Sequence, residues 1–230
     1  SKPEQRQLTE AELIELRALI KPAHVQAPAV QTAGAEYLEI ALFHVVVRKA
    51  STKPATAVAL QKAVPYPAVI IMSHGQTWRI HLAEKRPPKP NERKPGRPDK
   101  LIIERDYDSG WLDAPGAPSA PHFWEQAFWN AFALSHCRRS NLQVLYLDLC
   151  ARVLALSCAA VTGDYRLSDP ARGESLSARR ERLEQALAVD REIRSLRSQI
   201  RNEFDFARKL ELNQRVSTLR RQHAAYQKNL

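Results

Sequence analysis

The sequence is poor in glycine, with seven among its 230 residues. Little backbone is therefore free to wrap around a phosphate group, and neither the P-loop nor the Rossmann Gly-x-Gly-x-x-Gly pattern occurs. The His-Glu-x-x-His motif, the Gly-x-Ser-x-Gly elbow and the protein-kinase motifs are absent as well. The sequence thus lacks the common signatures of nucleotide-binding proteins and hydrolases. We predict no catalytic residue, no metal site and no cofactor.

Cysteine is equally scarce: the chain has Cys137, Cys150 and Cys158. An odd number of cysteines without metal-type spacing argues against a disulfide scaffold and for a reducing compartment. No charged-then-apolar leader opens the sequence, so we expect no signal peptide and a cytoplasmic protein.

Only one long apolar run is present, at residues 142–161. It carries Asp148 and Arg152 in its middle, and charges are costly at the centre of a bilayer. The run therefore predicts a buried helix, and no membrane partner is expected.

Positive charge is abundant, with a formal net charge of +10 and a pI near 9.8. Such a balance points to an anionic partner, nucleic acid first and a membrane surface second. Two segments carry much of this positive charge. Residues 86–100 hold six basic and two acidic side chains among several prolines, and residues 171–230 hold fourteen basic and eight acidic ones.

The first half of the chain has the pattern of a sheet. Residues 37–48, 68–72, 77–82 and 101–104 are rich in β-branched and apolar residues and are predicted to be strands. Residues 52–64 between the first two strands predict a crossover helix, with Thr52 as a possible cap. The short turn before residue 77 predicts an antiparallel hairpin. Because both faces of the first strand are apolar, we expect it to be central.

Helices are predicted on either side of this sheet. Thr9 and Glu12 form a capping-box pattern before Leu13, Leu16 and Ile20, which indicates a helix over residues 8–20. An aromatic stripe at helical spacing predicts another helix over residues 122–134.

From residue 177 onward the chain is charged and helical, with two apolar stripes at three-four spacing. The register does not continue through residues 202–206, so either an antiparallel helical hairpin or one long interrupted coiled coil fits. We interpret part of these stripes as an interface for a protein partner, formed by Leu196, Ile200, Val216, Leu219 and Tyr226.

The predicted fold class is α+β: a small, mostly antiparallel sheet with packed helices, followed by a helical segment and a C-terminal helical-hairpin coiled coil. The predicted domains are a core at residues 1–118 with the basic, proline-rich loop 86–100, a helical segment at 119–172 and a basic arm at 173–230. The loop is either a solvated connection or a finger that contacts phosphates. The predicted nucleic-acid contacts are Arg86, Lys89, Arg93, Lys94 and Arg97 of the loop and Arg194, Arg197, Arg201 and Arg208 of the arm.

Other polar residues favour structural roles. Asp106 and Asp108 precede Ser-Gly and are interpreted as part of a turn. His44 lies in an apolar strand and is expected to be a core histidine. Cys137 follows a histidine, but without an oriented base we expect a loop there and no nucleophile.

Four stretches resemble an uncharacterised bacterial family, number 4391 of the domains of unknown function. They are residues 38–43 of the first strand, the Pro-Tyr-Pro corner within 63–71, residues 106–112, and the tail Asn-Glu-Phe-Asp-Phe-Ala-Arg-Lys-Leu-Glu-Leu-Asn at 202–213. The resemblance implies an accessory protein, since members accompany helicase and DNA-methyltransferase proteins in restriction or antiphage defence operons. It implies no catalytic residue.

Three hypotheses follow. The first is a non-catalytic subunit of a defence or restriction-type complex that binds nucleic acid, DNA by preference, and a helicase- or methyltransferase-like protein. The second is a scaffold that forms a homodimer through the coiled coil without touching nucleic acid. The third is a divergent metal-dependent nuclease that uses Glu39, Asp106 or Asp108.

Overall fold

The computed structural model describes residues 8–32, 35–93, 101–117, 122–168 and 174–230. The chain divides into two compact units, residues 1–156 and 157–230. The first combines a mixed sheet with helices and the second is helical, so the α+β fold class is confirmed.

The main sheet runs in the order β1-β4-β5-β6-β7, and the short β8 also pairs with β6. Strands β4 and β5 are parallel, and every other pair in the sheet is antiparallel. Helix α3 (Ala55–Ala63) makes the crossover between them, with Pro54 rather than Thr52 at its N-cap. The strands are β1 (Ala11–Ile20), β4 (Ile40–Val47), β5 (Ala68–His74), β6 (Thr77–Arg86), β7 (Ile102–Asp108) and β8 (Leu112–Asp113). The predicted central strand, crossover helix and hairpin are all confirmed.

The first predicted helix is wrong, because residues 11–20 form strand β1 at the edge of the sheet. Its pairing with β4 is shifted at Glu12 and again at Arg17. These shifts place Ala11, Ile14, Leu16 and Leu19 opposite alternate residues of β4, namely Val47, Val45, Phe43 and Ala41. Because of the two β-bulges, the residues on one face of β1 are separated by three, two and three positions instead of the regular two. This spacing resembles the apolar spacing of a helix.

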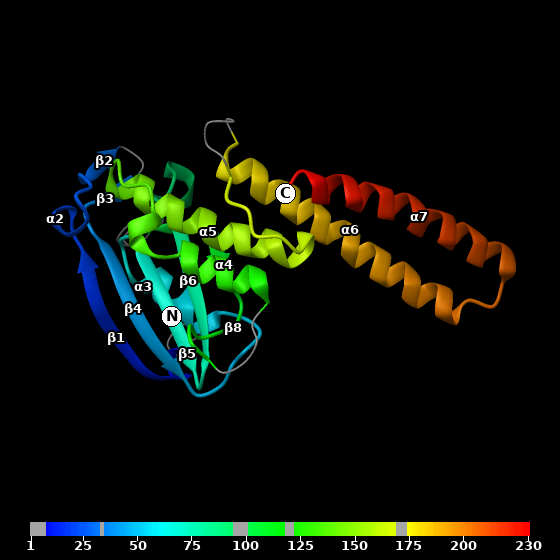
Figure 1. Ribbon diagram of the computed structural model, residues 1–230, viewed down its shortest axis with the longest axis horizontal. Helices are drawn as coiled ribbons and strands as arrows, with labels where there is room; N and C mark the ends of the chain where they lie inside the picture. The colour runs from blue at the N-terminus through cyan, green and yellow to red at the C-terminus, as the bar shows by residue number, and fades with distance from the viewer. Residues whose placement is uncertain (1–7, 33–34, 94–100, 118–121, 169–173) are drawn as a thin grey trace. The chain divides into compact units, whose positions relative to one another are not determined.

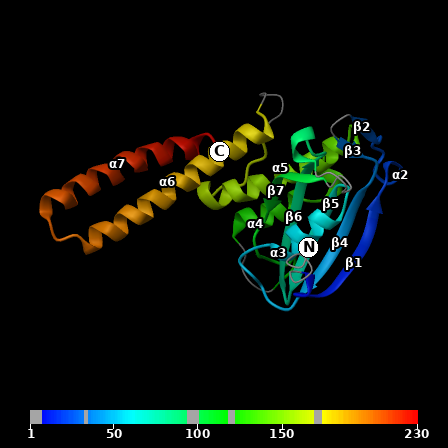
Figure 2. The same cartoon turned by 180° about the vertical axis from the view of Figure 1, so that it is seen from behind.

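Helices cover both faces of the sheet. On one face, α3 places Ala57 and Leu60 against Val45, Ile70 and Met72 in a buried apolar cluster (Figure 2). The other face carries α4 (Phe123–Ala131) and α5 (Leu142–Thr162) (Figure 1). A small ribbon of β2 (Val30–Thr32) and β3 (Ala35–Tyr37), the one-turn helix α2 (Pro22–Val25) and two 3₁₀ turns, η1 (Pro90–Glu92) and η2 (Leu134–His136), complete the connections.

Helix α5 is anchored to the sheet by polar as well as apolar contacts. The buried Tyr146 hydroxyl accepts from the Ala83 N–H and lies 3.0 Å from the carbonyl oxygens of Ala68 and Ala83. The helix is long and apolar enough to cross a membrane, yet 67% of its most apolar window is buried within the protein. This burial is typical of the core helix of a soluble protein, as the sequence predicted.

Asp148 and Arg152, the charges that interrupt this apolar run, form a buried ion pair on α5. Arg152 donates to Asp148 at 2.7 Å, and Arg138 binds the same carboxylate at 2.7 Å. Burial alone would raise the pKa of Asp148, but the hydrogen bonds from Arg138 and Arg152 outweigh that effect and lower it.

The second unit contains a helical hairpin of α6 (Leu176–Asn202) and α7 (Phe206–Lys228) (Figure 1). Ser175 caps α6 by accepting from the Ala178 N–H, and Asp205 caps α7 by accepting from the Ala207 N–H. The register slip in the sequence thus marks the loop of a hairpin, and the continuous helix is excluded.

Candidate nucleic-acid interface

The seam of the hairpin consists of apolar residues from both helices. Val189, Ile193 and Leu196 of α6 and Leu212 and Val216 of α7 are buried against one another. Three further residues, Ile200, Leu219 and Tyr226, pack against them in a partly buried state. All five residues predicted as a protein-partner interface lie in this seam, where the hairpin itself covers them.

Arginines flank the seam toward the loop end of the hairpin. A groove of about 340 Å³ is lined by Arg197, Ile200 and Arg201 of α6 and by Asn213, Val216, Ser217 and Arg220 of α7. Its floor is the partly buried Ile200 with the buried Val216, and its walls carry three exposed guanidinium groups from two helices. Two of the predicted phosphate contacts, Arg197 and Arg201, are therefore brought together.

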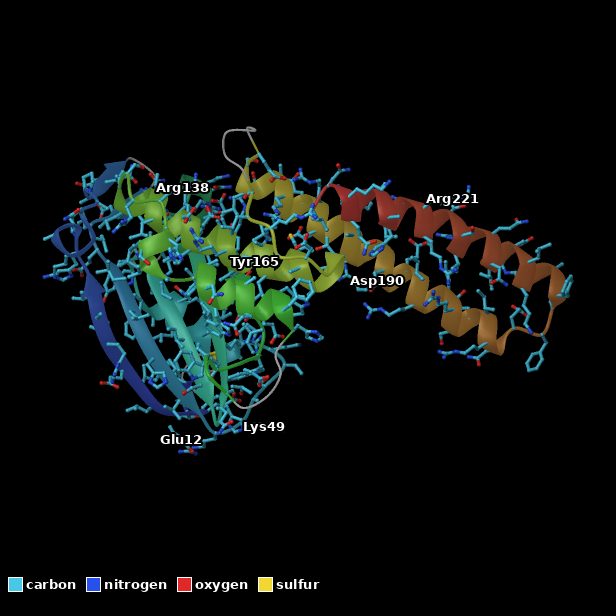
Figure 3. All side chains as sticks on the ribbon, viewed as in Figure 1. Glu12, Lys49, Arg138, Tyr165, Asp190 and Arg221 are labelled. Atoms are coloured by element: carbon cyan, nitrogen blue, oxygen red, sulfur yellow. The ribbon has the colours of Figure 1, made fainter. Side chains whose placement is uncertain are left out.

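The groove arginines differ from several other arginines of the hairpin, because no carboxylate of the described residues pairs with them. Arg194 pairs with Asp190 at 3.1 Å, Arg208 pairs with Glu211 at 2.8 Å, and Arg215 reaches Glu192 on the other helix. Figure 3 labels Asp190 on α6. By contrast, Arg197, Arg201 and Arg220 have no ion-pair partner in the part of the chain that the structure describes.

The unpaired state of these arginines has a chemical consequence. A guanidinium group presents five N–H donors in a planar fork and stays charged at any physiological pH. Three such groups around one groove repel one another until an anion binds between them. Phosphate oxygens suit this geometry because guanidinium groups can bind them bidentately.

The basic loop of the first unit contains an internal ion pair. Arg86 donates to both carboxylate oxygens of Glu92, at 2.7 and 2.9 Å, and the Lys89 N–H donates to the same group at 2.8 Å. The hydrogen bond from Arg86 lowers the pKa of Glu92 to about 2. Lys89 and Arg93 are exposed, whereas Lys94 and Arg97 lie outside the described residues.

The family assignment follows from the whole chain. A family model described as "Domain of unknown function (DUF4391)" matches residues 2–222. The chain belongs to this family. No curated protein and no solved structure matches the chain. Membership in DUF4391 agrees with the resemblance seen in the sequence, and it assigns a role to no residue.

Two acidic residues considered for a nuclease, Asp106 and Asp108, lie on strand β7 of this DUF4391 chain and have other contacts. Asp108 ends strand β7 rather than a turn, and it binds the buried Arg79 through both oxygens. The turn follows at Gly110, which has a φ of 68°. Asp106 lies on the same strand, 3.5 Å from the Nε2 atom of the fully buried His81. Among the described residues, no group of three or more His, Cys, Asp or Glu could hold a metal ion.

The cysteines are free and buried, as the sequence indicated. Burial raises the pKa of the Cys137, Cys150 and Cys158 thiols, so all three stay protonated and unreactive at neutral pH. His44 donates to or accepts from the Ser73 hydroxyl at 2.8 Å within the sheet.

The sequence analysis missed three groove residues, Asn213, Ser217 and Arg220. They become visible only when α6 and α7 are folded into a hairpin, because each lies one helical position from the seam residues Leu212, Val216 or Leu219. On a helical projection of both stripes, with a turn at residues 203–205, these three residues lie beside the seam.

Proposed function

We propose that this protein is a non-catalytic accessory subunit of a bacterial antiphage defence or restriction-type complex, and that it binds nucleic acid through the groove of α6 and α7. The observation that carries the proposal is the convergence of Arg197, Arg201 and Arg220, none with a carboxylate partner among the described residues. Arg194 and Arg208, the other two predicted contacts of the arm, lie on the same hairpin but outside the groove lining, and each is paired with a carboxylate.

The charge around the groove supports a polyanion as the ligand. Residues 194–221 hold eight lysines and arginines against three acidic residues, a local net charge of +5. The whole chain carries +10. A nucleic acid offers a row of phosphates spaced along a backbone, so several arginines can be neutralised at once and the counterions are released. DNA is the first candidate, because the family resemblance implies DNA-linked partners.

The test is fluorescence anisotropy with labelled single-stranded and double-stranded DNA across a salt series. Arg201→Gln/Arg220→Gln removes one groove arginine from each helix. Each phosphate contact contributes roughly 0.7 to 0.9 to the slope of log K against log salt, so the double variant should reduce the slope by about 1.4 to 1.8. Its affinity should fall at low salt.

A matched control removes the same charge from paired arginines. Arg180 pairs with Glu184 and Arg215 pairs with Glu192, one on each helix. We expect Arg180→Gln/Arg215→Gln to change the slope by less than half as much. Equal losses in both variants would mean that only total charge matters, and undiminished binding by the groove variant would exclude the groove as the site.

The protein partner in this proposal is a helicase- or methyltransferase-like subunit of the same complex. The seam residues are packed against one another within the hairpin, so we expect the partner to bind a different surface. Co-expression with the neighbouring operon products and gel filtration at high salt tests this association, which should persist when the salt has removed nucleic acid.

A further inference from the structure

Two phenylalanines are exposed where α6 turns into α7: Phe204 lies in the loop and Phe206 is the first residue of α7. The Phe204 side chain is 96% exposed and that of Phe206 is 80% exposed. Large aromatic side chains gain free energy when they leave water, and an exposed pair of them is typical of an interaction site. By contrast, the seam residues Leu196, Leu212 and Val216 are each less than 9% exposed, and Leu210 on α7, at 53%, is less exposed than either phenylalanine.

Hydrogen bonds hold this loop in one conformation. The Glu203 carboxylate accepts from the Phe204 N–H at 2.9 Å and from the Asp205 N–H at 3.1 Å. Asp205 in turn accepts from the Ala207 N–H at 2.8 Å and starts α7. The two acidic side chains beside the phenylalanines are therefore used to shape the loop, and the aromatic rings are presented by a fixed backbone.

The phenylalanines lie close to the arginine groove. Arg201 precedes Phe204 by three residues, and three residues of chain span at most about 11 Å. That distance is less than two nucleotides of an extended single strand, whose phosphates lie several ångströms apart. A strand whose phosphates occupy the groove can thus bring its next bases to the loop.

We propose that Phe204 and Phe206 stack against unpaired bases, so that the ligand of this site is single-stranded nucleic acid or a single-stranded end of a duplex. The inference rests on the proposed function, because the groove supplies the phosphate contacts. Aromatic side chains bind single strands by stacking on bases irrespective of sequence. In an intact duplex the faces of the bases are covered by their neighbours, and only a strand with free base faces can use both rings.

The experiment compares full-length variants on a 20-residue oligothymidylate and on a blunt duplex of equal length. Phe204→Ala/Phe206→Ala should weaken binding to the single strand at least tenfold and leave its salt slope unchanged, because no charge is lost. Binding to the blunt duplex should change less than twofold. Phe204→Trp/Phe206→Trp should restore the affinity for the single strand. Phe123→Ala is the matched control, since Phe123 is 69% exposed on α4 and should have no effect.

The outcomes separate this inference from the proposed function. If the groove variant loses binding while the double alanine variant binds the oligothymidylate like the wild type, stacking is refuted and the groove stands. Equal losses on the single strand and the duplex would also refute it. If the wild type binds neither DNA at low salt, the proposed function fails, and the aromatic loop belongs to a protein interface instead.

Discussion

Replacement of Asp148 by asparagine tests the buried ion pair in the longest helix of the first unit. The side chains of Asp148 and Arg152 are 9% and 5% exposed, whereas Arg138 is 51% exposed. Without the carboxylate charge Arg138 can turn to water, but Arg152 cannot. The Arg152 guanidinium group keeps hydrogen bonds to the Ala131 and His136 carbonyl oxygens, but it loses its ion pair with Asp148 while it stays buried.

The expected loss is about 3 kcal/mol of unfolding free energy, the lower end of the range for breaking a buried pair, because the two carbonyl contacts remain. With an m-value of roughly 2 to 3 kcal/mol/M, the urea midpoint should fall by about 1 to 1.5 M. Tryptophan fluorescence is the suitable probe. The four tryptophans, Trp78, Trp111, Trp124 and Trp129, all belong to the first unit, so the signal reports its unfolding alone.

The pH dependence gives a second, independent check. The pKa of Asp148 is lowered in the folded protein, so the pair contributes its stability above the pKa of the unfolded state. That contribution is lost as the pH falls through the folded pKa. The wild type and Asp148→Asn should therefore converge in acid and diverge toward neutral pH. As a control, Glu15→Gln breaks the exposed pair with Arg17 and should cost less than about 1 kcal/mol.

Two results would refute the reasoning. One is a midpoint for Asp148→Asn at pH 7 that equals that of the wild type. The other is a difference that stays constant into acid, because a packing defect does not titrate. Replacing both partners by apolar residues, as in Asp148→Leu/Arg152→Met, should recover part of the stability, since no stranded charge remains.

Three further predictions concern the sheet. Tyr146→Phe should cost about 1 to 3 kcal/mol in urea unfolding, because it leaves the buried Ala83 N–H without its acceptor. Burial lowers the pKa of Lys85 to about 7, so the unfolded state binds more protons above that pH. Stability should therefore rise between pH 7 and 9, and Lys85→Met should flatten that rise. Arg79→Lys should lower the urea midpoint, because lysine cannot bind both Asp108 oxygens and the Ser51 and Thr52 carbonyls together.

Much of the first unit could be predicted from its sequence because local patterns coincide with the final structure there. β4 is apolar on both faces and is central, and Gly75 adopts a positive φ of 56° in the β5–β6 turn. Strand β1 was not predicted, because its two bulges depend on pairing with β4, which is distant from it in the sequence. The same holds for Asp108, whose role is set by Arg79 on the neighbouring strand.

The hairpin shows why the binding residues were harder to predict than the helices. Its apolar stripes were correctly identified, but an apolar stripe gives no indication of whether its partner is another chain or the same one. Which of the two applies depends on the turn after Asn202, which folds α7 back onto α6 so that the two stripes pack against each other. The groove arginines beside the seam, together with Phe204 and Phe206, stay exposed when the hairpin is formed.

The apolar seam and the exposed groups of the hairpin are expected to have separate roles. The seam residues of α6 run from Val189 to Ile200, about 17 Å at 1.5 Å per residue, so the apolar seam reaches the loop end and can hold it in place without any partner. Stability then resides in the seam, and the binding that we propose resides in exposed groups that contribute little to it. Groove and loop substitutions should therefore change affinity without changing the thermal unfolding of the hairpin, whereas Leu196→Asp should unfold the hairpin and abolish binding together. If Leu196→Asp left both intact, the seam would not be the core of this hairpin.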